Sequence, residues 1–308
     1  MKYGGWFKIC FERELEKELT TVIVGDRRLL CVKRPSGIEV YDAVCPHRGA
    51  DLGVNSRLDG DSVICGYHAY HISLGVEESR PLCVRKYRSM VLGGLVFAVI
   101  GDFEDGEFPH FIAELHKTHH LVPGFKTSIK VAPELVIENA FDAAHFPPVH
   151  DVRKITQEKP FLEKGVFTAR TTLFVAPSMW QDGADVGDDE VRIEVPLFAR
   201  AFSPNLTVTA IAPGGEHPHY VIAGAVPQAN GDCSIRLSLA LERQPGDEGP
   251  NMSVAELLLK FENMGLEQDR PVWENLTPVD YNWLAQDSTI VDYRRFCDGF
   301  RLNGASPR

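Results

Sequence analysis

The first third of the chain contains short apolar stretches in which buried-type and polar-type residues alternate. The segment Ile38-Glu39-Val40-Tyr41 has the period of two that is typical of a half-buried strand. Gly25-Asp26 and Pro35-Ser36-Gly37 supply turns between such stretches. Further β-favouring runs occur at residues 20–24, 28–33, 63–65 and 94–100. The pattern predicts a small all-β domain with no helical period.

The rest of the chain has a mixed pattern. Residues 133–145 predict a helix that begins at Pro133, and Pro147-Pro148 is expected to end it. Strand-like segments return between residues 165 and 242. Residues 253–263 then predict a second helix with Ser253 as its N-cap.

An acidic stretch that contains glycine, residues 101–107, is typical of an exposed connector. We therefore place a domain boundary there, with an all-β domain over residues 1–105 and a second domain over residues 106–308. The expected fold class is α+β, because strands and helices are mixed in the second domain. The 308 residues leave room for two domains at about 100–200 residues each.

Composition excludes several classes of partner. The net charge of −11 argues against a protein that binds nucleic acid or an anionic membrane, since both need a basic surface. No apolar run approaches the ~20 residues that a membrane helix needs. The first residues, Met1 to Trp6, lack the features of a signal peptide, so we expect a cytoplasmic protein. Seven cysteines, an odd number in a long chain, fit reduced thiols better than a disulfide framework.

Two of these cysteines stand in a metal-binding pattern with two histidines. The spacing is C-x-H at Cys45 and His47, then seventeen residues, then C-x₂-H at Cys65 and His68. A Rieske-type [2Fe–2S] cluster needs two thiolates and two imidazoles, the imidazoles on one iron. Two loops that each supply one cysteine and one histidine can hold such a cluster from both sides.

Zinc is the alternative metal for these four residues, because two cysteines and two histidines can also coordinate a zinc ion. Zinc fingers and ribbons pair like ligands in each loop, as C-x₂₋₄-C and H-x₃₋₅-H. Here each loop is mixed, and both loops fall in a β-rich region. The pattern therefore favours an iron–sulfur cluster over zinc.

A second group of polar residues occurs about 80 residues later in the chain. Asn139, Asp142 and His145 are spaced at three and would share one face of the predicted helix, and His150 follows the Pro-Pro pair. Two histidines and one carboxylate form the facial set that holds Fe(II) in non-haem oxygenases. The alternative interpretation is a helix end with two solvent-exposed histidines and a capping aspartate.

Both patterns resemble one family, the Rieske non-haem iron oxygenases. C-P-H-R-G-A-D-L-G at residues 45–53 is similar to the family's cluster-binding signature, and E-N-x-x-D-x-x-H-x₄-H at residues 138–150 is similar to its mononuclear-iron motif. The chain departs from the family's usual Gly-Trp after the last cluster histidine, because Ala69-Tyr70 stands there. The resemblance implies a helix-grip-like catalytic domain of helices on an antiparallel sheet.

The resemblance also implies roles for single residues. Cys45, His47, Cys65 and His68 would bind the cluster, and His145 and His150 the Fe(II). Asp142 would accept a hydrogen bond from His145 and connect the iron to the cluster of a neighbouring subunit, which implies a homotrimer. Asn139 would be a polar neighbour of the iron.

The third iron ligand is expected to be a carboxylate from elsewhere in the chain. We choose Asp269, because its Q-D-x-x-x-W segment is similar to that of single-subunit-type members such as the steroid 9α-hydroxylase oxygenases. We expect this segment to follow the second helix. Glu267 is the nearest competitor, and Asp287 and Asp292 are weaker ones.

The implied activity is hydroxylation of an apolar polycyclic or natural-product substrate with O₂. A ferredoxin or flavin reductase would deliver the electrons. NAD(P)H would be oxidised by that partner, since the chain has no G-x-G-x-x-G fingerprint. Demethylation, desaturation and amine oxidation remain open as outcomes. An electron carrier without oxygenase activity is the rival from another functional class.

Overall fold

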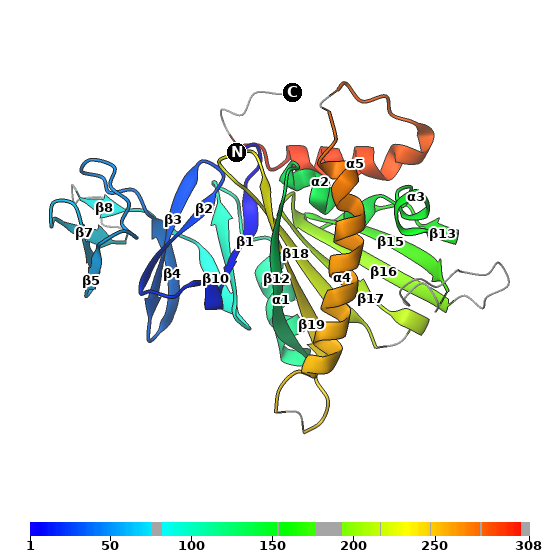
Figure 1. The fold of residues 1–308 in the computed structure, drawn as a ribbon, viewed down its shortest axis with the longest axis horizontal. Helices are drawn as coiled ribbons and strands as arrows, with labels where there is room; N and C mark the ends of the chain where they lie inside the picture. Colours follow the sequence, from blue (N-terminus) through cyan, green and yellow to red (C-terminus); the bar gives the residue numbers. More distant parts are fainter. Residues whose placement is uncertain are drawn as a thin grey trace.

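The computed structural model describes residues 1–75, 82–152, 154–176, 193–215, 217–246, 248–277 and 279–302. Small β-sheets form one end of the molecule, and a large sheet crossed by a long helix forms the other (Figure 1). Among the described helices, none is long and apolar enough to cross a membrane.

The N-terminal part is built from three small sheets. The first has the order β1 (Gly5–Phe11), β11 (Leu95–Ile100), β10 (Ser89–Leu92). The second is β2 (Leu19–Val24), β3 (Arg27–Arg34), β4 (Gly37–Asp42), β9 (Lys86–Tyr87), and the third is β5 (Arg57–Asp59), β6 (Ser62–Ile64), β7 (His71–Leu74), β8 (Cys83–Val84). Their apolar faces enclose buried cores that include Leu29, Leu30 and Ile72. The all-β prediction is confirmed.

The C-terminal part is an eight-stranded antiparallel sheet with helices on it. Its order is β12 (His119–Ile129), β19 (Cys233–Glu242), β18 (His219–Pro227), β17 (Leu206–Ile211), β16 (Ile193–Ser203), β15 (Val166–Val175), β13 (Lys154–Gln157), with β14 (Phe161–Glu163) paired to β15. The helices are α1 (Phe108–Thr118), α2 (Pro133–Glu138), α3 (Phe146–His150), α4 (Met252–Trp273) and α5 (Ser288–Asp298). The long helix α4 crosses the sheet and packs against β12 and β19 (Figure 1). The α+β expectation is confirmed.

The first predicted helix was wrong in its extent. Helix α2 ends at Glu138, a 3₁₀ turn spans Asn139–Phe141, and Pro147 and Pro148 lie at the start of α3 rather than ending a helix. Proline is tolerated in a first helical turn because the N–H groups there have no partner within the helix. The prolines therefore begin the short helix that carries His150.

The second predicted helix was too short. Helix α4 begins after Asn251, whose side chain accepts the Val254 N–H at 3.2 Å, so Asn251 and not Ser253 is the N-cap. It continues through Gly265 and Pro271 to Trp273. An interior glycine costs only about 1 kcal/mol relative to alanine, which packing of the helix on the sheet overrides. Asp269 consequently lies inside α4, not after it.

Strand β1 joins the two parts of the molecule. It pairs with β11 on one side and packs against β18 of the large sheet. The buried Lys8 Nζ donates hydrogen bonds to the Ile222 carbonyl (2.6 Å) and the Ser238 hydroxyl (2.9 Å). Nearby, Arg236 donates to the Glu14 carboxylate at 2.7 Å. These contacts fix the small sheets to the back of the large one.

Candidate metal centres and substrate cavity

Two loops at the far end of the N-terminal part have the same backbone conformation. In residues 45–50 and 65–70 the cysteine N–H donates to the carbonyl five residues later, at 2.8 and 2.9 Å. Each cysteine carbonyl also accepts the N–H four residues later, at 2.9 Å in both loops. The same turn therefore occurs in both loops, and each loop contains one cysteine and one histidine.

The four predicted cluster residues lie together across these loops. Cys45 and Cys65 are buried, whereas the His47 ring is exposed and the His68 ring partly so. The two rings lie edge to face with centroids 4.8 Å apart. Burial raises the pKa of the Cys45 thiol, and the adjacent Cys65 thiol raises it further. Two sulfurs inside and two imidazoles outside form the donor set of a Rieske cluster.

The departure at Ala69 has a conformational consequence. Ala69 adopts φ +59°, and the matching residue of the first loop, Gly49, adopts φ +75°. Left-handed backbone is unfavourable for alanine because its Cβ crowds the carbonyl, and glycine has no such cost. Tyr70 follows, 46% exposed, with its ring edge-on to His47 at 4.7 Å. The second loop thus has the same turn as the first, although alanine stands where the first loop has glycine.

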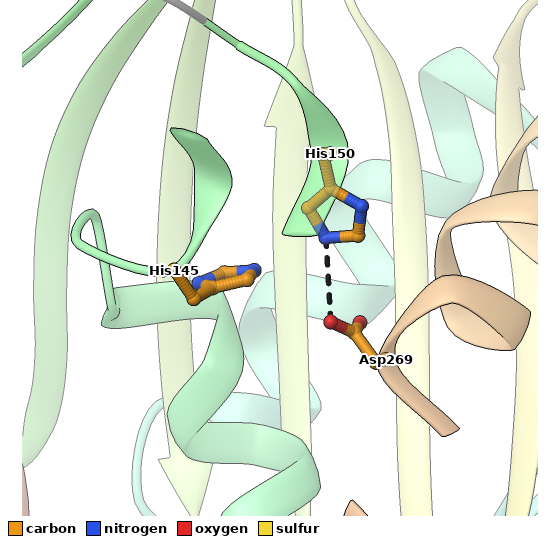
Figure 2. Close-up of side chains that lie close together, drawn as sticks. All are labelled: His145, His150 and Asp269. Atoms are coloured by element: carbon orange, nitrogen blue, oxygen red, sulfur yellow. Dashed lines mark ion pairs between the residues drawn. The ribbon is translucent and has the colours of Figure 1, made fainter. Parts of the chain in front are cut away.

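The predicted iron ligands meet at one point in the C-terminal part. One donor atom each from His145, His150 and Asp269 lies within 4.8 Å of the others. The histidines come from the chain around α3 and the aspartate from α4, and the three side chains point toward a common space (Figure 2). The His150 Nε2 lies 3.4 Å from Asp269 Oδ1. This is the two-histidine, one-carboxylate set that suits Fe(II).

Each of these three side chains is held by a further hydrogen bond. The His145 Nδ1–H donates to the Asp142 carbonyl (2.5 Å), and the His150 Nδ1–H donates to Gln268 Oε1 (2.8 Å). The Asn139 amide donates to Asp269 Oδ2 at 2.9 Å. Because Nδ1 is engaged in both rings, each Nε2 keeps a lone pair for a metal. The tautomers follow from this hydrogen-bond network.

Burial and charge act differently on the two histidines. Burial lowers the pKa of His145 below its usual value. Burial also acts to lower the pKa of His150, but the hydrogen bonds that the protonated ring makes to Asp269 and Gln268 outweigh it and raise that pKa. Asp269 itself is only 7% exposed. A buried carboxylate between two imidazoles favours a cation at their centre.

The expectation for Asp142 needs correction. Its carboxylate accepts the Ala144 N–H at 2.9 Å, and its backbone carbonyl, not its side chain, accepts from His145. The predicted helix would have placed the side chain beside His145. Because the helix ends early, Asp142 has an extended backbone (φ −87°, ψ 97°) that turns its carbonyl toward the ring.

The competing carboxylates lie in other settings. Glu267 is exposed and accepts hydrogen bonds from Arg270 at 2.7 Å. Asp292 pairs with Arg295, and Asp287 accepts the Leu284 N–H. Of the four candidates, Asp269 is the carboxylate that the structure brings to the two histidines.

A cavity of about 360 Å³ opens beside this site, between the sheet and α4. Its wall is mainly aliphatic, and includes the following side chains: Val136, Val152, Leu173, Val175, Val195, Leu197, Ile211, Val221, Ile235 and Leu237. Helix α4 contributes residues at positions 261, 262, 264, 265, 266, 268, 269 and 273, which together form one broad side of the helix. The sequence reasoning missed Glu262, Gly265 and Gln268, which a correctly extended helix would have placed on or beside this face.

Two family models match the chain. Residues 5–81 match the Rieske [2Fe-2S] domain, and residues 101–300 match the 3-ketosteroid 9alpha-hydroxylase C-terminal domain. The chain belongs to the Rieske oxygenases. As an oxidoreductase of this family it carries a [2Fe–2S] cluster and a mononuclear iron, uses O₂, and receives electrons from a partner.

Curated relatives and solved structures agree with this membership. This chain is 21% identical to the oxygenase component of 3-ketosteroid-9-alpha-monooxygenase from Rhodococcus rhodochrous, over 97% of this chain and 81% of the relative. It is 24% identical to cholesterol 7-desaturase of Drosophila melanogaster, over 48% and 38% of the two chains. Dicamba monooxygenase bound to dicamba has the same fold, with a TM-score of 0.71, 16% identity and 96% coverage of both chains.

Proposed function

We propose that this Rieske oxygenase hydroxylates an apolar, polycyclic substrate in the cavity beside His145, His150 and Asp269. The observation that carries the proposal is the geometry of these three side chains. Two imidazoles with Nδ1 engaged and one buried carboxylate meet beside an apolar cavity. Such a site suits a metal that must keep open positions for O₂ and substrate.

The roles of the chain's residues follow from their places. Cys45, His47, Cys65 and His68 would hold the cluster in the domain of residues 1–105. His145, His150 and Asp269 would hold the Fe(II) in the domain of residues 106–308. When bound, the cluster supplies electrons and the Fe(II) activates O₂.

The surrounding residues would orient these ligands and exclude water. Gln268 fixes the His150 ring, and Asn139 fixes the carboxylate of Asp269. The aliphatic wall keeps bulk solvent away from the reacting carbon. The protein's contribution is thus to position a substrate and hold three ligands in one arrangement.

We further propose that a ferredoxin or flavin reductase docks where the cluster histidines reach the surface, and passes on electrons from NAD(P)H. His47, Tyr67 and Tyr70 are exposed there. A homotrimer would bring one subunit's cluster end toward the next subunit's iron, with Asp142, whose backbone carbonyl accepts the His145 Nδ1–H, as the connecting residue. We expect the protein in the cytoplasm.

Steroid-like molecules are the substrate class that we favour. The cavity volume of about 360 Å³ falls in the range for small-molecule sites, and its wall is aliphatic. Two relatives are named for steroid chemistry, a 9α-monooxygenase and a 7-desaturase. Hydroxylation is the proposed outcome. Analysis of products would reveal desaturation, demethylation or amine oxidation if one of these occurs instead.

Metal quantification tests the proposal. We expect three irons for every two acid-labile sulfides, and a red-brown protein. An electron carrier without its own oxygenase site would give two irons for every two sulfides, and a zinc protein would be colourless. Turnover of a steroid panel with NADH and a surrogate reductase then tests hydroxylation, and a protein with full metal content that oxidises none of these compounds would contradict the proposed substrate class.

A further inference from the structure

One acidic side chain lines the cavity away from the metal-binding residues. Glu262 lies on α4 and contributes to the cavity wall. Within the described part of the chain, no hydrogen bond or ion pair engages its carboxylate. Burial raises the pKa of this carboxyl to about 7. The residue is half-buried, and it is part of the cavity wall.

A carboxyl group in an apolar wall is costly unless something pairs with it. Among the described residues that line the cavity, none is a lysine or an arginine. Outside the metal-binding end, the other polar wall groups among the described residues are Thr207 and Thr209 on β17, which are neutral, and the Thr207 hydroxyl already donates to the Arg200 carbonyl at 2.9 Å. The protein thus leaves the Glu262 carboxyl available to a ligand.

The helix fixes the distance between Glu262 and the metal-binding end. Glu262 and Asp269 are seven residues apart in α4, which is two turns on one face. At a rise of 1.5 Å per residue their Cα atoms are about 10 Å apart along the axis. A ligand that lies along α4 in the cavity would meet Glu262 about two helical turns away from the metal-binding residues.

Gly265 leaves the space between these two carboxyl groups open. A Cβ at this position would have His150 Cε1 as its nearest neighbour, at 4.0 Å, so no contact requires glycine there. Glycine inside a helix costs about 1 kcal/mol relative to alanine. The absent side chain instead widens the cavity next to His150, where a ring of the substrate can lie.

We infer that Glu262 determines substrate specificity by accepting a hydrogen bond from a hydroxyl or protonated amine about 10 Å from the carbon presented to the metal-binding residues. The inference rests on the proposed function for the identity of the reacting end. It names the substrate class more closely: an apolar ring system with a hydrogen-bond donor at the opposite end and no carboxylate. A ligand carboxylate would repel Glu262 and lack a cationic partner in the wall.

Binding measurements on one skeleton test this. Four compounds with the same fused rings carry a hydroxyl, an aminomethyl, a methoxy or a carboxylate group at one end, and calorimetry gives Kd for each. For the unaltered protein we expect the hydroxyl or the aminomethyl compound to bind about ten-fold more tightly than the methoxy compound. We expect the carboxylate compound to bind most weakly. Whichever donor binds more tightly identifies the source of the hydrogen bond.

Two substitutions at Glu262 complete the test. In Glu262→Leu the donor preference should disappear, and in Glu262→Gln the preference for the amine should disappear while the hydroxyl compound still binds. Glu256→Gln, an exposed glutamate on the same helix, is the control and should keep the original ranking. Circular dichroism establishes that each variant is folded. Equal binding of all four compounds, or an unchanged ranking in Glu262→Leu, would overturn the inference.

The outcome is separable from that of the proposed function. Calorimetry needs neither reductase nor O₂, and iron and sulfide are measured independently on the same samples. A three-to-two ratio with no donor preference removes only the role of Glu262. A two-to-two ratio with the preference intact removes the iron site and leaves the specificity role in place.

Discussion

The two metal-binding regions differ in how the chain brings their ligands together. The cluster residues all fall within residues 45–68, on two loops with the same backbone hydrogen bonds. The iron-site residues come from segments more than a hundred positions apart, and meet only because α4 crosses the sheet next to α3 (Figure 1). The geometry of the cluster site therefore depends on two local turns, whereas the geometry of the iron site depends on where the long helix α4 lies against the sheet.

The regions also differ in exposure. The cluster loops turn His47 outward and keep their cysteines inside. Asp269 is buried, and His145 and His150 beside it are half-buried and line a cavity. Electron entry requires a surface that a partner can reach, whereas oxygen chemistry benefits from the exclusion of water. Each region thus has the exposure that its proposed role needs.

Removal of the remote carboxylate should separate the two regions most clearly. In Asp269→Ala we expect the iron content to fall from three to two per two sulfides, and turnover to fall by about 10²-fold or more, because a metal ligand is lost. The cluster's visible absorption should stay unchanged. Glu267→Ala is the matched control and should keep three irons. Loss of iron in the control but not in Asp269→Ala would make Glu267 the ligand.

Loss of the hydrogen bond between His150 and Gln268 should weaken iron binding less than loss of a ligand does. In Gln268→Ala we expect the affinity for the mononuclear iron to fall by about 10–100-fold, since the ring loses the group that orients it. Titration of metal-depleted protein with Fe(II) measures this. Gln286→Ala, at an exposed position in the same part of the chain, should leave the affinity unchanged. An unaltered affinity in Gln268→Ala would mean that the ring is held by its other contacts.

The cavity should show a cost in stability that depends on pH. Glu262 has its pKa raised to about 7 by burial, against an ordinary value of 4.5. Between these two pH values the folded state holds a proton that the unfolded state releases. The stability of the folded state is therefore highest below pH about 4.5, and part of it is lost as the pH rises through 7. We expect Glu262→Gln to be more stable than the unaltered protein by about 1–2 kcal/mol at pH 8 and equal to it near pH 4.5. Denaturant unfolding at both pH values measures the difference, and equal gains at both would exclude titration as its cause.

The smallest effect is expected within the cluster region itself. Ala69→Gly should stabilise the second loop by about 0.5–1 kcal/mol, because glycine adopts a φ of +59° without strain. Gly49→Ala should destabilise the first loop by a similar amount, and no neighbour lies within 4 Å of the added Cβ to confuse the comparison. Unfolding followed by the cluster's visible absorption gives both values. The change in the free energy of unfolding must have opposite signs in the two variants, and equal signs would contradict the prediction.

The amino-acid sequence by itself was enough for the local features. The alternation of residues 38–41 predicted a strand that is present in β4, and the cysteine–histidine spacing predicted two loops that do lie together. Such features depend on neighbours a few positions away, where backbone sterics and turn geometry leave few choices. The residues that the helix motif named, His145 and His150, were identified for the same reason.

The tertiary structure decided what depends on distant contacts. Spacing alone could not show that α2 ends at Glu138, that Asp142 turns its carbonyl toward His145, or that α4 runs past Gly265 to Trp273. The reason is that helix ends depend on packing energies that exceed a local propensity of about 1 kcal/mol. Only that extended helix places Glu262, Gly265 and Asp269 on one wall of the cavity, whereas the sequence pattern had identified Asp269 alone.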